Sequence, residues 1–245
     1  IRKLQAVDTL GSATVICTDK TGTLTTNQMT AQKIYADKKV INVTGVGYEP
    51  KGNFEHENTP INLKENEVFT QFFHTAVLCN DARLRRREVE ETFRWEIQGD
   101  PTEGALIVAA EKAGYEKDII EEKFPRVDEI PFNSKTRYMV TFNKTSQTQI
   151  TAYCKGAPET ILNMCTQIQQ NGKIENLTQQ TKDQILSNNY EMANQALRVL
   201  AFAYKNIEEE NLEDFKEKIQ KTNPQLVFVG LIGLIDPPRE EAKQA

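Results

Sequence analysis

The chain has 245 residues, of which 38% are hydrophobic and 27% charged, and it carries a net charge of −5. This composition is ordinary for a globular protein and predicts one large domain, or one and a half, with a sizeable core. The acidic balance argues against a nucleic-acid partner, and the basic run at residues 83–87 is expected to be a solvated loop.

The longest apolar run, Leu226–Ile235, is interrupted by glycines. It is far shorter than the ~20 residues of a membrane helix. The four cysteines lack metal-type spacing, which favours reduced, mostly buried thiols in a cytosolic compartment. The chain opens without Met and ends at Ala245 within a charged run, so we interpret it as a fragment of a longer protein.

An apolar run at residues 14–17 stops at Asp19 and the Thr-Gly-Thr loop that follows. The run predicts a buried strand, and ligands in open α/β sheets bind beyond the carboxyl ends of the strands. Asp19 is therefore placed for chemistry. Its carboxylate could attack a phosphoryl group if Mg²⁺ and Lys20 offset its charge and residues 21–23 receive the phosphate oxygens. The structural alternative is an ordinary turn at the end of a strand.

The rest of the chain predicts an antiparallel sheet flanked by helices. Periodicity and turn residues predict short strands over residues 30–44, a helix over 65–84, a strand–turn–strand over 129–142 with a third arm at 148–155, a polar helix over 177–194 and a strand over 198–204. Asp100 is expected to cap a helix with Pro101 in its first turn, Glu103 at the capping-box position and Gly114 at its end. Lys155-Gly156-Ala157-Pro158-Glu159 predicts a strand that ends where a helix begins.

Two strings are specific enough to suggest a family. Asp-Lys-Thr-Gly-Thr at residues 19–23, followed by Leu-Thr, resembles the phosphorylation signature of P-type ion-transporting ATPases, a branch of the haloacid-dehalogenase-like phosphotransferases. Lys-Gly-Ala-Pro-Glu at residues 155–159 resembles the same family's nucleotide-pocket signature. In that family the Asp takes the γ-phosphoryl group of ATP. The resemblance therefore implies catalytic roles for Asp19, Lys20, Thr21 and Thr23, and Mg²⁺ ligation by Asp19 and Thr21. Thr21 stands where related phosphatases carry a second Asp, and without that carboxyl group the acyl phosphate would hydrolyse slowly.

Further strings resemble the family's adenine pocket. Residues 99–106 match a segment whose Glu, here Glu103, lies near the adenine amino group, and residues 131–134 match one whose Phe, here Phe132, stacks on adenine. Arg137 stands where the family has a Lys, which keeps the charge but changes the donor geometry. The nucleotide-binding residues that the resemblance implies are Asp100, Thr102, Glu103, Phe132, Arg137, Met139, Lys155, Gly156, Arg198, Leu200, Asp236 and Arg239.

The resemblance also implies a domain organisation of class α/β (α+β). Residues 1–27 and 230–245 would form a partial haloacid-dehalogenase-like, Rossmann-type phosphorylation domain. Residues 28–229 would form a nucleotide-binding domain with an antiparallel twisted sheet. The family's later Thr-Gly-Asp and Gly-Asp-Gly-x-Asn-Asp motifs have no counterpart here, so we expect the phosphate and Mg²⁺ site to be incomplete.

We therefore expect the ATP-binding cytosolic part of an integral membrane ATPase that couples ATP hydrolysis, through an aspartyl phosphate, to cation transport. The loop at residues 44–52 looks like that of the calcium-pump branch. The expected partners are ATP and the remaining phosphorylation, actuator and membrane domains of the same polypeptide, and the fragment alone should only bind nucleotide. Two alternatives remain: a soluble haloacid-dehalogenase-like phosphatase with a large cap domain, which Thr21 and the adenine-pocket strings oppose, and a non-catalytic nucleotide sensor.

Overall fold

The computed structural model describes residues 12, 14–15, 17–64, 66–89, 92–221, 223–239 and 241–242. The chain divides into two compact units. Residues 28–235 form the larger, which we call the sheet unit, and residues 1–27 and 236–245 form the smaller, which we call the Asp19 unit. The division expected at residue 230 falls inside a strand, β13 (Leu226–Ile235), and the sheet keeps that strand whole because it pairs with neighbours along its length.

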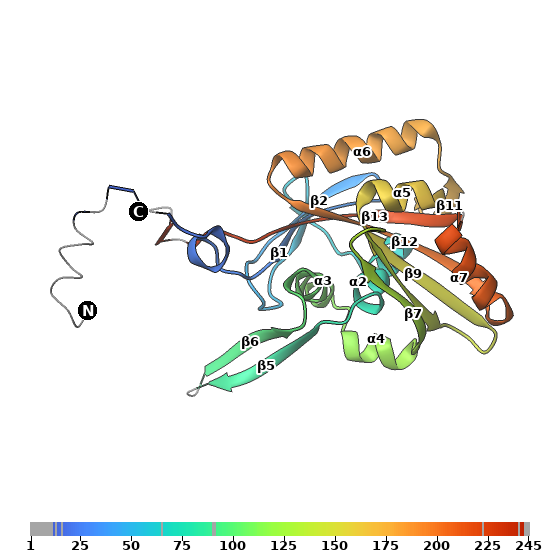
Figure 1. The fold of residues 1–245 in the computed structure, drawn as a ribbon, viewed down its shortest axis with the longest axis horizontal. Coiled ribbons are helices and arrows are strands. Elements are labelled where there is room, and N and C mark those ends of the chain that lie inside the picture. Colours follow the sequence, from blue (N-terminus) through green and yellow to red (C-terminus); the bar gives the residue numbers. More distant parts are fainter. Residues whose placement is uncertain are drawn as a thin grey trace. The chain divides into compact units, whose positions relative to one another are not determined.

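The sheet unit is built on one eleven-stranded, mostly antiparallel sheet (Figure 1). Its main path runs β4–β3–β2–β1–β13–β12–β9–β8–β7, and β10 adds β11 and pairs in parallel with β13. The strands are β1 (Thr30–Ala36), β2 (Lys39–Val43), β3 (Phe54–His56), β4 (Thr59–Pro60), β7 (Arg126–Asn133), β8 (Tyr138–Lys144), β9 (Gln149–Gly156), β10 (Cys165–Gln170), β11 (Lys173–Asn176), β12 (Arg198–Glu208) and β13. The expected antiparallel sheet flanked by helices is confirmed.

Helices cover both faces of this sheet (Figure 1). One face packs against α2 (Glu67–Leu78), α3 (Pro101–Lys112) and α4 (Lys117–Lys123). The other packs against α5 (Pro158–Met164), α6 (Gln179–Asn194) and α7 (Leu212–Lys221), the last preceded by a 3₁₀ turn, η2 (Glu209–Asn211). Burial on both faces explains why β13 reads as a continuous apolar run instead of an alternating one. Among the described residues, no helix is long and apolar enough to cross a membrane.

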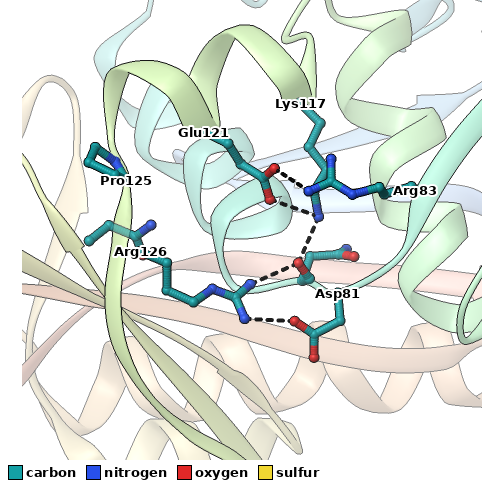
Figure 2. Close-up of a pocket in the computed structure, with 8 residues that line it drawn as sticks. Asp81, Arg83, Lys117, Glu121, Pro125 and Arg126 are labelled. Atoms are coloured by element: carbon teal, nitrogen blue, oxygen red, sulfur yellow. Dashed lines mark hydrogen bonds and ion pairs between the residues drawn. The ribbon is translucent and has the colours of Figure 1, made fainter.

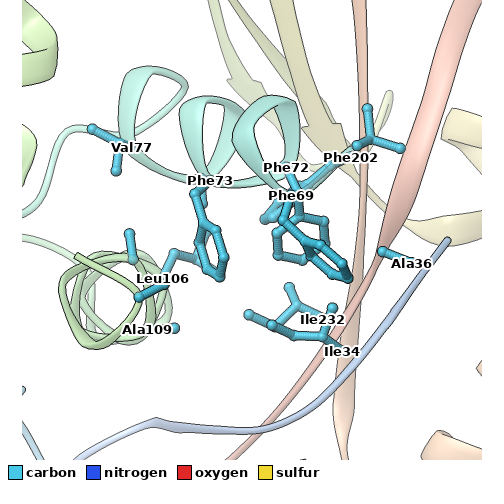
Figure 3. Close-up of a cluster of buried hydrophobic side chains, with 14 of the residues drawn as sticks. Ile34, Ala36, Phe69, Phe72, Phe73, Val77, Leu106, Ala109, Phe202 and Ile232 are labelled. Carbon is cyan, nitrogen blue, oxygen red and sulfur yellow. The ribbon is translucent and has the colours of Figure 1, made fainter. Parts of the chain in front are cut away.

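The core beneath α2 is aromatic (Figure 3). Phe72 packs its ring against Phe202 of β12 at a centroid distance of 4.8 Å and against Phe73 at 5.3 Å. Each buried Phe contributes roughly 1.5–3 kcal/mol of hydrophobic stabilisation. The expected helix over residues 65–84 is confirmed but shorter, because Cys79 leaves the helical conformation and the side chain of Asn80 donates to the carbonyl of Ala76.

The basic run at residues 83–87 is a strand, so the expected solvated loop is wrong. It belongs to β5 (Arg83–Val89), which pairs with β6 (Thr92–Gln98) in a separate two-stranded ribbon. Leu84 pairs with Ile97 and packs against the core, and Arg86 lies 3.8 Å from the ring centre of Phe93. Cross-strand pairs and a cation–π contact thus stabilise a segment that is rich in arginine.

The expected start of α3 is confirmed. The Asp100 carboxylate accepts hydrogen bonds from the backbone N–H groups of Thr102 and Glu103 at 2.8 and 3.2 Å, Pro101 occupies the first turn, and Gly114 follows the helix with φ of 79°. Glu103 does not complete the expected capping box, because its carboxylate is engaged elsewhere. The helix therefore begins with one side-chain cap and leaves Glu103 available for another role.

In the Asp19 unit, the strand expected at residues 14–17 is not present at residues 14, 15 and 17, the part of it that the structure describes. Lys20–Leu24 instead form a single wide helical turn, η1. A strand needs a hydrogen-bonded neighbour, and in the described part of this unit the recorded β-bridge is the isolated one between Thr25 and Pro238. The Rossmann-type arrangement expected here is therefore not shown.

Candidate functional site

A buried ion pair stands at the centre of the candidate site. Lys155 of β9 is 6% exposed, and its Nζ lies 2.5 Å from Oε1 of Glu103 in the first turn of α3. Its cross-strand neighbours are Met139 of β8 and Phe202 of β12, which belong to the core beneath α2 and α3. Because opposed residues share a face, Lys155 points to the same side as this core. The sheet and the helix N-terminus thus bring together two residues that lie far apart in sequence.

Both carboxylate oxygens of Glu103 accept hydrogen bonds. Its Oε1 accepts the bond from Lys155, and its Oε2 accepts the backbone N–H of Asp81 at 2.9 Å. An ionised carboxylate has about four acceptor positions. The two recorded bonds leave acceptor capacity for a donor group on a ligand.

Phe132 lies on the outer strand β7 and is 60% exposed. The pairing of β7 with β8 shifts by one residue between Ile130, opposite Val140, and Asn133, opposite Tyr138. Side chains alternate between faces along a strand, so the inserted residue places Phe132 on the face opposite to Tyr138, which is the face of Met139 and Lys155. Neighbouring strands lie about 4.8 Å apart, so β7 and β9 are about 10 Å apart. An exposed ring thus flanks the ion pair.

The turn between β7 and β8 closes one end of this face. Arg137 has φ of 60°, and its N–H donates to the carbonyl of Asn133 at 2.7 Å. A Cβ atom at Gly156 would lie only 2.4 Å from the Arg137 carbonyl, so β9 passes this turn because it carries glycine there. The close approach positions the exposed Arg137 beside the end of β9.

The same face continues along β12. Arg198 and Leu200 alternate with residues of the opposite face, and Arg198 donates to Oγ1 of Thr102 at 3.3 Å. Leu200 is half-buried and packs against the core. The structure therefore gathers most of the predicted nucleotide-binding residues on one face: Thr102, Glu103, Phe132, Met139, Lys155, Arg198 and Leu200. Asp100 serves as the helix cap.

Asp236 and Arg239 belong to the Asp19 unit, and their recorded contacts are within it. Thr25 donates to the Asp236 carboxylate at 2.5 Å. Arg239 donates to the carbonyls of Thr25 and Gly22, each at 3.1 Å. These bonds tie the segment after β13 to the loop that follows Asp19. Their expected part in nucleotide binding stays a prediction.

The predicted catalytic loop is exposed at Asp19, Lys20 and Thr23, and the side chain of Thr21 lies outside the described residues. No group of three or more His, Cys, Asp and Glu side chains that could hold a metal ion occurs in the described part of the chain. The incomplete Mg²⁺ site expected from the missing sequence motifs stays a prediction.

Comparison with known proteins decides the family. Residues 68–241, well over half of the chain, match the family described as "P-type ATPase, cytoplasmic domain N". The chain belongs to the P-type ATPase family. It is 42% identical over 99% of its length to a cation-transporting ATPase of Synechocystis, of which it covers 26%. Over its whole length it is 35% identical to a calcium-transporting ATPase of Bacillus subtilis and 39% identical to calcium-transporting ATPase 1 of Bacillus cereus, covering 27% and 24% of them.

The chain thus spans about a quarter of the length of these curated relatives. The resemblance drawn from the two motif strings is confirmed, and the soluble phosphatase and the sensor are not favoured. The sequence reasoning missed one part of this P-type ATPase domain, the turn at Asn80 and Asp81 that holds Glu103. An Asn-Asp pair directly after the last apolar residues of a helix is a turn signal that could have indicated it.

Proposed function

We propose that the face at the start of α3 binds ATP. The observation that carries the proposal is the buried Glu103–Lys155 ion pair on the same side of the sheet as the exposed ring of Phe132. A base stacks on an aromatic ring, and a carboxylate accepts a hydrogen bond from the adenine amino group. Lys155, Arg137 and Arg198 supply positive charge for the phosphates, while Met139, Gly156 and Leu200 complete the pocket wall.

Within a whole P-type ATPase, we propose that Asp19 is the phosphoryl acceptor. One carboxylate oxygen of Asp19 attacks the γ-phosphorus, the bond to the bridging oxygen breaks, and ADP leaves with the electron pair. Lys20 offsets negative charge, and Thr21 and Thr23 lie where phosphate oxygens would be received. A water later hydrolyses the acyl phosphate and restores the carboxylate. Magnesium is the ion that the family resemblance implies, and its ligands are not gathered by the described residues.

The names of the relatives support a proposal for the transported ion. The names of the proteins that the chain matches include both cation-transporting and calcium-transporting ATPases. We propose cation transport, with calcium as the ion, by a membrane protein whose cytosolic portion includes this chain. The remaining phosphorylation, actuator and membrane domains of that polypeptide would be its partners, because the chain spans about a quarter of the relatives.

The test of nucleotide binding is calorimetric titration of the chain with ATP in the absence of Mg²⁺. Phe132→Ala removes the exposed ring and should weaken ATP about tenfold or more, since stacking on an aromatic side chain is worth ~1–3 kcal/mol. Phe93→Ala is a matched control, because Phe93 is 56% exposed on the β5–β6 ribbon. If a folded Phe132→Ala variant bound ATP as tightly as the unchanged chain, Phe132 would not be part of the ATP site.

A further inference from the structure

A polar cavity of about 370 Å³ lies beside the turn between α2 and β5 (Figure 2). The residues that line it include Asn80, Asp81, Arg83, Lys117, Glu121 and Arg126. Lys117 is only 4% exposed, and its Nζ lies 3.2 Å from Glu121, to which Arg83 also donates at 2.8 Å. Burial lowers the pKa of Lys117, and the neighbouring Glu121 opposes that shift. None of these residues is among those proposed above to contact the nucleotide.

Asn80 is the fully buried centre of this arrangement. Its Nδ2 donates to the carbonyls of Ala76 and Glu103, each at 2.9 Å, and its Oδ1 accepts the N–H of Ala82 at 2.9 Å. Its own carbonyl accepts from Nζ of Lys117 at 2.7 Å and from Arg126 at 2.9 Å. A buried amide that uses both its donors and its acceptor has one orientation available. The turn after α2 is therefore fixed by charged side chains from α4 and β7.

This turn reaches Glu103 by two independent bonds. Asn80 binds the Glu103 carbonyl, and the next residue, Asp81, donates its N–H to the Glu103 carboxylate. Arg126 holds the turn itself, because it donates to the Asp81 carboxylate at 2.7 Å and to the Asn80 carbonyl at 2.9 Å. Without the turn, the side-chain position of Glu103 would depend on Lys155 alone. Two long side chains hold a position less tightly than a backbone N–H does.

We infer that Asn80 is a positioning residue of the nucleotide site, and that Lys117 and Arg126 fix it so that the Glu103 carboxylate distinguishes adenine from guanine. The inference rests on the proposed ATP binding at Glu103. Adenine presents an amino donor where guanine presents a carbonyl acceptor. A fixed carboxylate accepts from the first and opposes the second, whereas a mobile carboxylate can turn away from guanine.

The test compares dissociation constants for ATP and GTP, measured by calorimetry on the full chain. In both Asn80→Asp and Arg126→Gln we expect the preference for ATP over GTP to fall about fivefold, as for the loss of one hydrogen bond. Arg83→Gln is the matched control, because it removes one charge from the same cavity without a bond to Asn80. It should leave the preference unchanged. Melting curves establish that each variant is folded, and Arg126→Gln carries the test if Asn80→Asp does not fold.

A Glu103→Gln variant separates this inference from the function on which it rests. If the unchanged chain binds neither nucleotide, the proposed function and the inference both fall. If Glu103→Gln lowers the preference while folded Asn80→Asp and Arg126→Gln keep it, ATP binding stands and the inference is overturned. Combining Arg126→Gln with Glu103→Gln should lower the preference no further than Glu103→Gln alone, because both act through one carboxylate.

Discussion

The Glu103–Lys155 pair and the Asp19 loop are both proposed to act on ATP, yet the structure holds them very differently. Lys155 is 6% exposed, and Glu103 is held by a side chain, a backbone N–H and a helix start. Asp19 is exposed, and the turn beside it is tied by bonds of Thr25 and Arg239. The residues proposed to hold the base therefore lie in a packed part of the sheet unit, whereas the proposed phosphoryl acceptor lies on an exposed loop.

The largest expected effect separates chemistry from binding. Asp19→Asn removes the nucleophilic oxygen, so it should abolish acid-stable labelling by γ-labelled ATP in a whole P-type ATPase that contains this chain. The same substitution should leave the ATP affinity of the chain alone nearly unchanged. Trapping of acid-stable label at Asp19 in good yield by the 245-residue chain itself would contradict the account of an incomplete catalytic site.

A smaller effect is expected on the free energy of unfolding, and it tests whether the ion pair preorganises the binding site. Lys155→Met leaves the Glu103 carboxylate without its cation, at 17% side-chain exposure. Removing one partner of a buried pair should lower the free energy of unfolding by about 3 kcal/mol. Urea denaturation measures this loss, and the Lys155→Met, Glu103→Gln double variant should recover part of it. A double variant no more stable than the single one would argue that the pair is not coupled.

Sequence reasoning succeeded where the determining contacts are local. The cap at Asp100, the stop at Gly114 and the strand-to-helix junction at Pro158 depend on residues within a few positions of one another. It failed where partners are remote. The strand at residues 83–87 is stabilised by its pairing with β6, and the hold on Glu103 requires Arg126 and Lys117 from two other elements.

The family resemblance supplied more residues of the candidate site than the sequence pattern alone could predict. Phe132 is an example. Simple alternation along β7 would put it on the face of Ile130, and the shift in pairing that turns it to the Lys155 face is visible only in the register with β8. The unexpected conformation at residues 14, 15 and 17 has a similar cause, since an apolar run forms a strand only beside a partner strand.

A third prediction concerns pH and the scaffold of the sheet unit. His74 of α2 contacts the rings of Tyr115 and Phe124, and burial, with a smaller effect of Lys123, lowers its pKa to about 4. The unfolded chain, with an ordinary His pKa near 6.5, binds more protons than the folded chain between these values. Stability should therefore be full above about pH 6.5 and fall by at most ~3 kcal/mol as the pH drops to 4.

The measurement is the free energy of urea unfolding across that pH range, compared with a His74→Gln variant. The variant should lose this component of the pH dependence while keeping any component that arises from carboxylates. Identical profiles for the two proteins would show that His74 titrates normally in the folded state. ATP affinity should be the same in both at pH 7, because His74 is neutral there and has no recorded contact with the candidate site.

Hydrogen exchange with and without ATP tests whether ATP binds the sheet face at the start of α3. Backbone amides over residues 100–104, 132–139 and 155–157 should exchange more slowly with ATP present, while those of the β5–β6 ribbon should not change. Addition of GTP should give weaker protection at residues 100–104. Protection absent from all three segments, or confined to other parts of the chain at saturating ATP, would show that ATP does not bind this face.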